Sequence, residues 1–571
     1  MMKIPFGVPA LAARFKIIDL AVFFVILGIF SLILYVASGW RSVMIPSLVI
    51  DLDPVNIPYY AAQSLVRMFL AYVLSLLFSI WYGYTANRSK THEQIMIPLL
   101  DVLQSIPVLS FLPGVVLAMI ALFPERRIGL ELASVLLIFT GQVWNMAFSY
   151  YNSINTMPNE LIEVTRIYRH SRFTRFLNLD LPFSSIGLIW NSMMSVAGGW
   201  FFLMACEMFV LKDKDFRLPG LGSYIQTAAN QGDMQHVLCG IGTMIGIIIF
   251  LDILVWRPVV AWSQKFRFDT VQAEDERESL VLEVLRKSSL AQRLDRMFTI
   301  AINRSEKAFS KMESTSKSKF VRILKEVVSL AGMALVVALF GWAIFQALQL
   351  LAGLSFNDYI TVATAALFSV MRTTAALFLA FLWTVPLGVY IGLNPRASRV
   401  LQPLVQVVAS IPATAVFPVI LLFLIQLGGG LGIGSVFLML LGTQWYILFN
   451  VIAGASAIPQ DLKEVTKLYG LKGIEKWKVL ILPGIFPYLV TGLITATGGA
   501  WNATIVSEYV TFGGETLKTV GLGSLIGEST ANGNFGLLLM STLVMAVIVV
   551  SINRLLWKRL FALAQEKYRL E

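Results

Sequence analysis

Two glutamates stand inside long apolar stretches of this chain, each at the same distance after a tryptophan. The pairs are Trp200 with Glu207 and Trp501 with Glu508. An ionisable side chain is costly inside a membrane, and it marks a candidate site for a solute or an ion. Each carboxylate either lines a solute pathway as a gate or bonds to backbone groups of its own part of the chain near the outer interface.

Two arginines form a second pair of charged candidates. Arg67 stands near the start of the apolar stretch 60–86, and Arg372 stands near the start of the stretch 362–393. A guanidinium is a good partner for an anion, so both residues are candidates for a pathway contact. The alternative is that each long side chain extends to the membrane interface, as arginines near helix ends commonly do. The sequence leaves both interpretations open.

Uncharged polar side chains offer weaker contacts along the same stretches. These residues are Ser105, Asn145, Asn191, Ser410 and Asn502. Hydroxyl and amide groups can hydrogen-bond a solute without holding it by charge, which suits a protein that must release its cargo. The same groups also join neighbouring helices inside membranes, so they are candidates for either role.

The motif Ser-Ile-Pro occurs twice, ending at Pro107 and at Pro412. Proline lacks the N–H that an α-helix needs, and it disfavours a helical conformation for the residue before it. We therefore expect a break or bend in each apolar stretch that contains the motif. Carbonyl groups freed by such a break are tolerated in a membrane where they line a cavity or meet a partner. Pro107 and Pro412 are therefore also candidates for the pathway.

The sequence does not indicate enzyme chemistry. It contains no Gly-x-x-x-x-Gly-Lys-Ser/Thr segment to hold nucleotide phosphates. Its three histidines, His92, His170 and His236, are scattered, and Cys206 and Cys239 lack the spacing of a metal or redox site. We therefore expect no catalytic residues, no metal and no cofactor bound by this chain.

The composition is that of a membrane protein. Of the 571 residues, 57% are hydrophobic and 14% are charged, whereas about 25% of residues are charged in ordinary soluble domains. The net charge of +11 comes from arginines and lysines that concentrate in particular loops between apolar stretches. That distribution indicates membrane topology and not a nucleic-acid partner.

The apolar stretches predict the number of membrane spans. A helix needs about 20 mostly apolar residues to cross the bilayer. The stretches of this kind lie near 17–38, 60–86, 97–121, 128–151, 182–210, 236–258, 326–352, 362–393, 400–426, 431–454, 483–511 and 537–562. We predict an all-α polytopic membrane protein with about 12 transmembrane helices. The arginines and lysines in short loops favour cytoplasmic termini.

The chain is an internal duplication. SLVR at 64–67 matches SVMR at 369–372, and GLGSYI at 220–225 matches GLGSLI at 521–526. Six stretches repeated in the same orientation predict two parallel six-helix halves. The glycine-rich repeats are expected on the outer side, within short helix-plus-turn segments. The expected domains are a first half at 1–258, a charged helical cytoplasmic connector at 259–325 and a second half at 326–571.

A polar segment in each half closes on Leu-Pro before the next apolar stretch. The two copies are EVTRIYRHSRFTRFLNLDLP at 163–182 and EVTKLYGLKGIEKWKVLILP at 464–483. Pro459 suits the first turn of a helix, and Gly470 can take the positive φ that ends one. Each segment therefore predicts a short helix held between two spans at the cytoplasmic face.

The spacing within these segments is similar to that of the EAA loop of ABC importer permeases. The matching residues include Glu163 and Thr165 in the first copy and Glu464, Thr466 and Gly470 in the second. Tyr168 and Tyr469 recur in the two copies and are further candidates for coupling. Arg169 stands where the family has glycine, so the first helix is expected to end differently or to hold its partner less tightly. In that family the loop forms a coupling helix that docks on a separate ATPase subunit, which binds ATP and Mg.

The Ser-Ile-Pro, Trp-to-Glu and Gly-Leu-Gly features resemble permeases of the nitrate, sulfonate, taurine and bicarbonate class, with two subunits fused in one chain. The resemblance implies a bacterial inner-membrane importer of a small solute, expected to be an anion. Its expected partners are two ABC ATPase subunits, a periplasmic or lipid-anchored substrate-binding protein and membrane lipid. The alternatives are a fused permease for ferric iron or thiamine and a secondary transporter with two parallel six-helix halves.

Overall fold

The computed structural model describes most of both halves. The described ranges are 48–105, 107–124, 126–168, 171–211, 214–266, 280–289, 344–409, 411–426, 430–512 and 515–567, with isolated residues within 19–40, 292–300 and 338–342. The expected first and seventh spans, 17–38 and 326–352, lie largely outside these ranges, as do the residues closest to both termini.

Eight helices within the described ranges are long and apolar enough to cross a membrane. In the first half their central parts are α2 (Ile57–Ala86), α5 (Ile128–Asn155), α8 (Leu181–Glu207) and α10 (Met234–Leu251). In the second half they are α15 (Phe356–Leu393), α18 (Leu431–Ala457), α21 (Leu482–Glu508) and α23 (Phe535–Ile552). The all-α polytopic class predicted from the sequence is confirmed, with the same helices recurring in the same order.

The third expected span of each half is two helices and not one. In the first half α3 (Lys90–Ser105) ends before Pro107, and the short turn η2 (Val108–Phe111) leads into α4 (Leu112–Leu122). In the second half α16 (Pro395–Ala409) is followed by α17 (Ala413–Gln426). Pro107 has the extended backbone angles φ −58° and ψ 127°, which end a helix. The break expected at each Ser-Ile-Pro motif is therefore present within the stretches predicted at 97–121 and 400–426.

A short antiparallel hairpin follows the fifth span in each half. Strand β1 (Met208–Leu211) pairs with β2 (Lys214–Arg217), and β3 (Tyr509–Phe512) pairs with β4 (Glu515–Lys518). The helices α9 (Leu221–Asn230) and α22 (Leu522–Asn532) come next. The helix-plus-turn prediction missed these strands, whose sequences MFVL and YVTF contain the aromatic and β-branched residues that suit a pleated strand.

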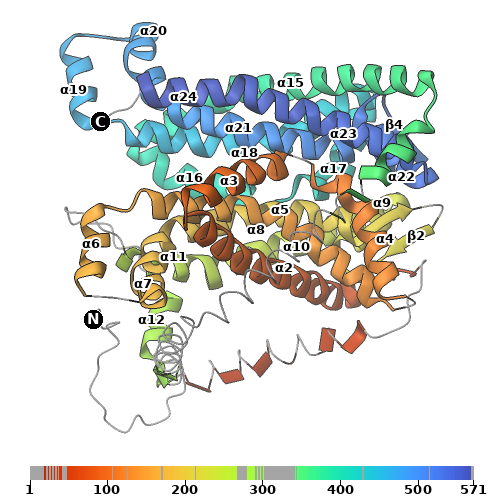
Figure 1. The fold of residues 1–571 in the computed structure, drawn as a ribbon, viewed down its shortest axis with the longest axis horizontal. Coiled ribbons are helices and arrows are strands. Elements are labelled where there is room, and N and C mark those ends of the chain that lie inside the picture. The colour runs from red at the N-terminus through yellow and green to blue at the C-terminus, as the bar shows by residue number, and fades with distance from the viewer. Residues whose placement is uncertain are drawn as a thin grey trace.

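The polar EVT segments form short helices at one end of the molecule. They are α6 (Asn159–Ile167) and α7 (Arg172–Arg175) in the first half, and α19 (Gln460–Leu468) and α20 (Gly473–Lys476) in the second. Figure 1 shows α6, α7, α19 and α20 on the left, with the hairpin strands β2 and β4 at the opposite side. We call these two sides the EVT end and the hairpin end.

The central helix of each half packs against two long neighbours. Helix α5 packs against α2 and α8, and α18 packs against α15 and α21. Small residues allow close approach, as at Gly392, where an added Cβ would lie 2.7 Å from the Cβ of Ala455. The halves lie one above the other in Figure 1, and they meet through α10 with α17 and through α3 with α23.

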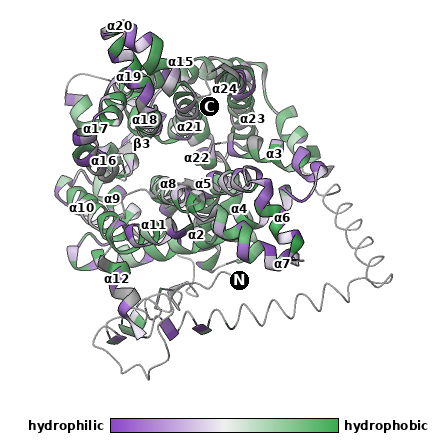
Figure 2. Ribbon diagram, turned by 90° about the vertical axis from the view of Figure 1, so that its left-hand side faces the viewer, coloured by the Kyte–Doolittle hydropathy of each residue, from purple (hydrophilic) through white to green (hydrophobic). Residues whose placement is uncertain are grey.

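The connector between the halves is described in part. Helix α11 (Arg257–Ser263) continues across the expected domain boundary at 258, and α12 (Leu280–Lys287) follows it. Figure 2, viewed from the EVT end, shows hydrophobic residues over most of the spanning helices and hydrophilic residues on α12 and α20. Much of the remaining connector lies outside the described residues.

Candidate functional site

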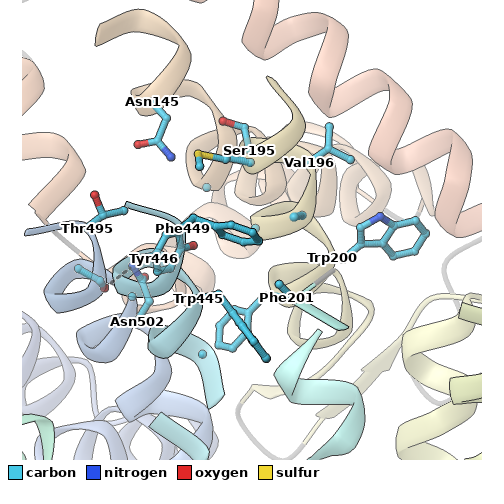
Figure 3. Close-up of a pocket in the computed structure, with 18 of the residues that line it drawn as sticks. Asn145, Ser195, Val196, Trp200, Phe201, Trp445, Tyr446, Phe449, Thr495 and Asn502 are labelled. Carbon is cyan, nitrogen blue, oxygen red and sulfur yellow. Dashed lines mark hydrogen bonds between the residues drawn. The ribbon is translucent and has the colours of Figure 1, made fainter. Parts of the chain in front are cut away.

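A cavity of about 540 Å³ lies between the two halves. Residues of α5, α8 and α10 line it from the first half, and residues of α18, α21 and α23 line it from the second. In Figure 3, Asn145 and Ser195 lie above the cavity, and Tyr446 and Asn502 lie below it. Six tryptophans also line it, and these are Trp144, Trp190, Trp200, Trp256, Trp445 and Trp557. The volume falls within the range of about 300–1,000 Å³ that is typical of small-molecule sites.

The cavity offers hydrogen bonds in place of positive charge. Its polar lining includes the amides of Gln104, Asn145 and Asn502 and the hydroxyl group of Thr495. No lysine or arginine is among its described lining residues. The acidic residue of the lining is Asp252, which accepts a 2.9 Å hydrogen bond from Arg257 Nε. A solute would therefore meet N–H and O–H donors and aromatic faces without a fixed cation.

The helix interruptions at Pro107 and Pro412 lie beside the cavity, and the residues just after them form hydrogen bonds between the two halves. The backbone N–H of Val108, just after the first break, donates to Asn502 Oδ1 at 2.7 Å. The hydroxyl group of Thr414, just after the second break, donates to the carbonyl of Phe201 at 3.2 Å. Phe201 and Asn502 follow the paired tryptophans of α8 and α21 directly, so each break contacts the same position of the opposite half.

Glu207 is a buried capping group and does not line the cavity. It is fully buried at the end of α8. It accepts hydrogen bonds from Ser64 Oγ at 2.6 Å, from the backbone N–H of Gly222 at 2.7 Å and from Arg67 at 2.7 Å. Ser64 Oγ in turn accepts from the backbone N–H of Leu221 at 2.9 Å. Together, Ser64 and Glu207 satisfy the backbone donors that the start of α9 leaves free.

Glu508 repeats this arrangement at the start of α22. Its carboxylate is fully buried and accepts from Ser369 Oγ at 2.8 Å and from the backbone N–H of Gly523 at 2.8 Å. Ser369 Oγ accepts from the backbone N–H of Leu522 at 2.9 Å. We call the groups around Glu207 and around Glu508 the first and second clamps. Each carboxylate thus bonds to backbone groups of its own half.

The glycines of the Gly-Leu-Gly repeats lie against the buried carboxylates of the clamps. A Cβ at Gly220 would collide with the carboxylate of Glu207, and a Cβ at Gly521 would collide with that of Glu508. A Cβ at Gly222 would lie 2.7 Å from Met204 Cα. The repeated glycines are therefore required where the backbone passes closely over a buried carboxylate.

The two arginines belong to these clamps and not to the cavity lining. Arg67 lies well inside α2 with its side chain fully buried, and it forms ion pairs with Glu131 and Glu207. Arg372 forms an ion pair of 3.0 Å with Glu508 and also donates to the carbonyl of Val520. The site residues predicted from the sequence did not include Ser64, Ser369 and Glu131. The signals for them were the matching SLVR and SVMR motifs and an acidic residue within an apolar stretch.

The remaining pathway candidates have mixed positions. Asn145, Asn502 and Pro412 line the cavity, whereas Pro107 is buried beside it at the start of η2. The side chain of Ser105 and the whole of Ser410 lie outside the described residues. Within the described part of the chain, no group of His, Cys, Asp and Glu residues could hold a metal ion.

The EVT helices present apolar side chains outward. Ile167 is 77% exposed and Tyr168 is 72% exposed at the end of α6, and Leu468 is 85% and Tyr469 79% exposed at the end of α19. Each short polar helix therefore ends in two large apolar side chains that are mostly exposed. Glu163 and Glu464 are also exposed, whereas Thr165 and Thr466 are buried and bond to the carbonyls of Ile162 and Lys463.

The end of α19 has the expected glycine cap. Gly470 has a φ of +66°, and the backbone N–H of Leu471 donates to the carbonyl of Thr466 at 3.0 Å. This left-handed cap ends the helix with Tyr469 exposed. Arg169, which replaces the glycine in the first copy, lies outside the described residues.

A family model for the binding-protein-dependent transport system inner membrane component matches the chain twice, at residues 75–257 and 384–560. Together the two matches cover more than half of the chain. The chain therefore belongs to this family of transport permeases, in a fused and duplicated form. Because the family serves binding-protein-dependent systems, a secondary transporter is not favoured.

The chain is similar to nitrate, bicarbonate and taurine permeases. The nitrate import permease protein NrtB of Leptolyngbya laminosa is 27% identical over 188 residues, which span 33% of this chain and 62% of the relative. The bicarbonate transport system permease protein CmpB of Synechococcus elongatus is 28% identical over 197 residues, spanning 34% and 66%. The taurine transport system permease protein TauC of Escherichia coli is 26% identical over 159 residues, spanning 28% and 54%. Each match spans less than two thirds of the relative.

Proposed function

We propose that this chain forms the complete transmembrane pathway of an ATP-driven importer. Its halves take the places of two separate permease subunits, and two ATPase subunits, which bind ATP and Mg, dock on α6 and α19. The observation that carries this proposal is the pair of short helices with exposed apolar ends at the same side of a duplicated family fold. Closure of the ATPase pair would push both helices and switch the access of the cavity.

The proposed cargo is a small anion of the nitrate, sulfonate, taurine or bicarbonate type. The named relatives support this class. The described cavity lining has no fixed cation, so an anion would be held by N–H and O–H donors alone. Weak binding of this kind suits a pathway that must release its cargo, and a separate binding protein at the hairpin end would supply the affinity.

The proposal also places the chain in the membrane. The EVT end faces the cytoplasm of a bacterial cell, the hairpin end faces outward, and both termini are cytoplasmic. The first half, the connector at 259–325 and the second half are separate domains, and the connector lies on the cytoplasmic side. In this assignment the positive charge around α20, from Lys472 before it, Lys476 at its end and Lys478 after it, faces the anionic inner surface of the membrane.

A mild-detergent purification of the tagged chain from its native membrane tests the proposal. Mass spectrometry of the bound proteins should find an ATPase subunit at about two copies per chain, one for each coupling helix. Gly470→Val should lower this recovery, because valine resists the left-handed conformation that ends α19. Gly242→Ala is the matched control, since nothing lies within 4 Å of an added Cβ there. Recovery of other complexes without any ATPase would contradict the proposal.

A further inference from the structure

The two clamps differ in how they bind the central helix of their half. In the first clamp, Glu131 of α5 is fully buried and accepts from Arg67 Nη2 at 3.0 Å and from Arg127 Nη2 at 2.7 Å. Arg67 also bonds to Glu207 at the end of α8. One buried guanidinium therefore joins α2, α5 and α8 at the hairpin end.

Between the residues that the structure describes, the second clamp makes no such link to its central helix. The paired tryptophans Trp144 and Trp445 align α5 with α18 without a gap, and this alignment places Gly432 opposite Glu131. Among the described residues, the ion pair of Arg372 is with Glu508 of α21, and its other hydrogen bonds go to Thr519 and Val520. Within the described part of the chain, the start of α18 therefore makes no ion pair like the one that holds the start of α5.

A tyrosine adds a second difference of the same kind. Tyr224 of α9 donates its hydroxyl hydrogen to the carbonyl of Leu52 at 3.0 Å. Burial raises the pKa of Tyr224 to about 12. The matching residue in GLGSLI is Leu525, which has no hydrogen-bond donor in its side chain. Among the described residues, the first half thus has one polar bond to its central helix and one from its outer helix that have no counterpart at the aligned positions of the second half.

We propose that Glu131 is a positioning residue that makes the hairpin end of the first half the fixed wall of the pathway. Opening toward the hairpin side then takes place in the second half, between α18 and the unit formed by α15, α21 and α22. Separating α5 from Arg67 would break the buried ion pair with Glu131, leaving Arg67 paired with Glu207 and Glu131 paired with Arg127. Loss of a buried ion pair is unfavourable. Separating α18 from Arg372 breaks no ion pair between described residues, and the Arg372 side chain is already 11% exposed.

Hydrogen–deuterium exchange of the full chain in lipid nanodiscs tests this difference. In the wild-type protein, amides at the start of α18 should exchange on the order of tenfold faster than those at the start of α5. Glu131→Gln should raise the rate at the start of α5 and leave α6 unchanged, because it removes the charge and keeps the size of the side chain. This inference builds on the proposed pathway, but the measurement needs neither the cargo nor the ATPase.

A gain-of-contact variant makes the test independent of any loss of stability. A Cβ at Gly432 would lie 3.7 Å from Thr519 Oγ1, which itself accepts from Arg372 Nη2 at 2.8 Å. An added Cβ therefore fits at Gly432 close to the Arg372 site. We expect the carboxylate of Gly432→Glu to pair with Arg372 and to slow exchange at the start of α18 toward the rate at α5. Gly432→Gln is the matched neutral control and should produce a much smaller effect.

Three results would overturn the inference. They are equal exchange at the starts of α5 and α18 in the wild-type protein, equal protection by Gly432→Glu and Gly432→Gln, and a rise in exchange throughout the first half in Glu131→Gln. The last result would assign a general structural role to Glu131. If Glu131→Gln does not fold, the comparison of α5 with α18 in the wild-type protein and the two Gly432 variants still test the inference. Failure to recover an ATPase would count against the proposed function and would leave these rates unaffected.

Discussion

At the scale of single residues, the buried polar groups of the two clamps satisfy one another's hydrogen-bonding and charge requirements. Glu207 and Glu508 each receive a serine hydroxyl group, a backbone N–H and a guanidinium. A buried carboxylate is stable only when it is paired and hydrogen-bonded. The clamps therefore fix where α9 and α22 begin, and they explain why serine, arginine, glutamate and glycine recur together in both halves.

Gly222→Ala should destabilise the chain by about 1–3 kcal/mol, because the added methyl group overpacks a site without room. The nearest atom to that methyl group would be Met204 Cα, at 2.7 Å, and a backbone atom cannot turn aside as a side chain can. Thermal unfolding in detergent measures the effect. Gly242→Ala in α10 should be neutral or slightly stabilising, since the site is open and alanine favours helix. Equal behaviour of the two variants would contradict the packing argument.

Ser64→Ala should cost about 1–3 kcal/mol, because it leaves the buried N–H of Leu221 without a partner. Ser369→Ala should cost a similar amount in the second half, where the same hydroxyl group accepts from Leu522. Unfolding curves of both variants, measured at one detergent concentration, provide the comparison. An absence of effect in both would show that the starts of α9 and α22 do not depend on the serines.

At the scale of elements, the broken third spans join the halves around the cavity. Each break ends one helix and frees a backbone or side-chain donor that bonds to the fifth span of the opposite half. Because α4 and α17 begin at these breaks, their positions depend on the other half. A change of angle between the halves must therefore alter the bonds at Val108 and Thr414.

Asn502→Ala should weaken the contact between halves by about 1–3 kcal/mol, since the N–H of Val108 then lacks its acceptor. Asn450→Ala is the matched control, because Asn450 donates to the carbonyl of Tyr446 within its own helix, as Asn502 does to Gly498. Thermal unfolding followed by tryptophan fluorescence should separate the two variants. If both lose the same stability, the link between halves contributes little.

At the scale of the whole molecule, the duplication places one exposed helix end of each half at the EVT end. The cavity lies between the halves, so any force applied to both EVT helices acts on both of its walls (Figure 1). The charge content of the two clamps is unequal, whereas the EVT helices are similar in length and exposure. We therefore expect similar docking of two partners with an unequal response at the hairpin end.

Leu468→Ser should reduce ATPase recovery from about two copies per chain to about one, because each docking surface depends on its exposed apolar residue. Ile167→Ser should do the same on α6, and the double variant should recover almost none. Val49→Ser is the control, since Val49 is an equally exposed apolar residue away from both EVT helices. Quantitative mass spectrometry of purified complexes gives the stoichiometry. Retention of two ATPase copies by the double variant would place the docking surface elsewhere.

Local patterns in the sequence determined much of this protein. Apolar length predicted the helical membrane class, the repeated motifs predicted the duplication, and Pro459 and Gly470 predicted the ends of α19. These features depend on neighbours along the chain, so they are readable without a fold. The Ser-Ile-Pro motifs likewise predicted the interrupted third spans.

Only the tertiary structure decided which polar residues meet. Arg67 and Glu207 looked like candidates for a pathway, yet they close on Glu131 and Ser64 in a buried clamp. Likewise, the sequence does not distinguish Asn502 from the other amide side chains, whereas the fold shows that it accepts a hydrogen bond from the backbone N–H of Val108. A charged side chain inside a membrane needs a partner of opposite charge or one that hydrogen-bonds to it. The sequence shows that such a partner is needed but does not show which residue it is. The partner is chosen by helix packing that brings together side chains distant along the chain.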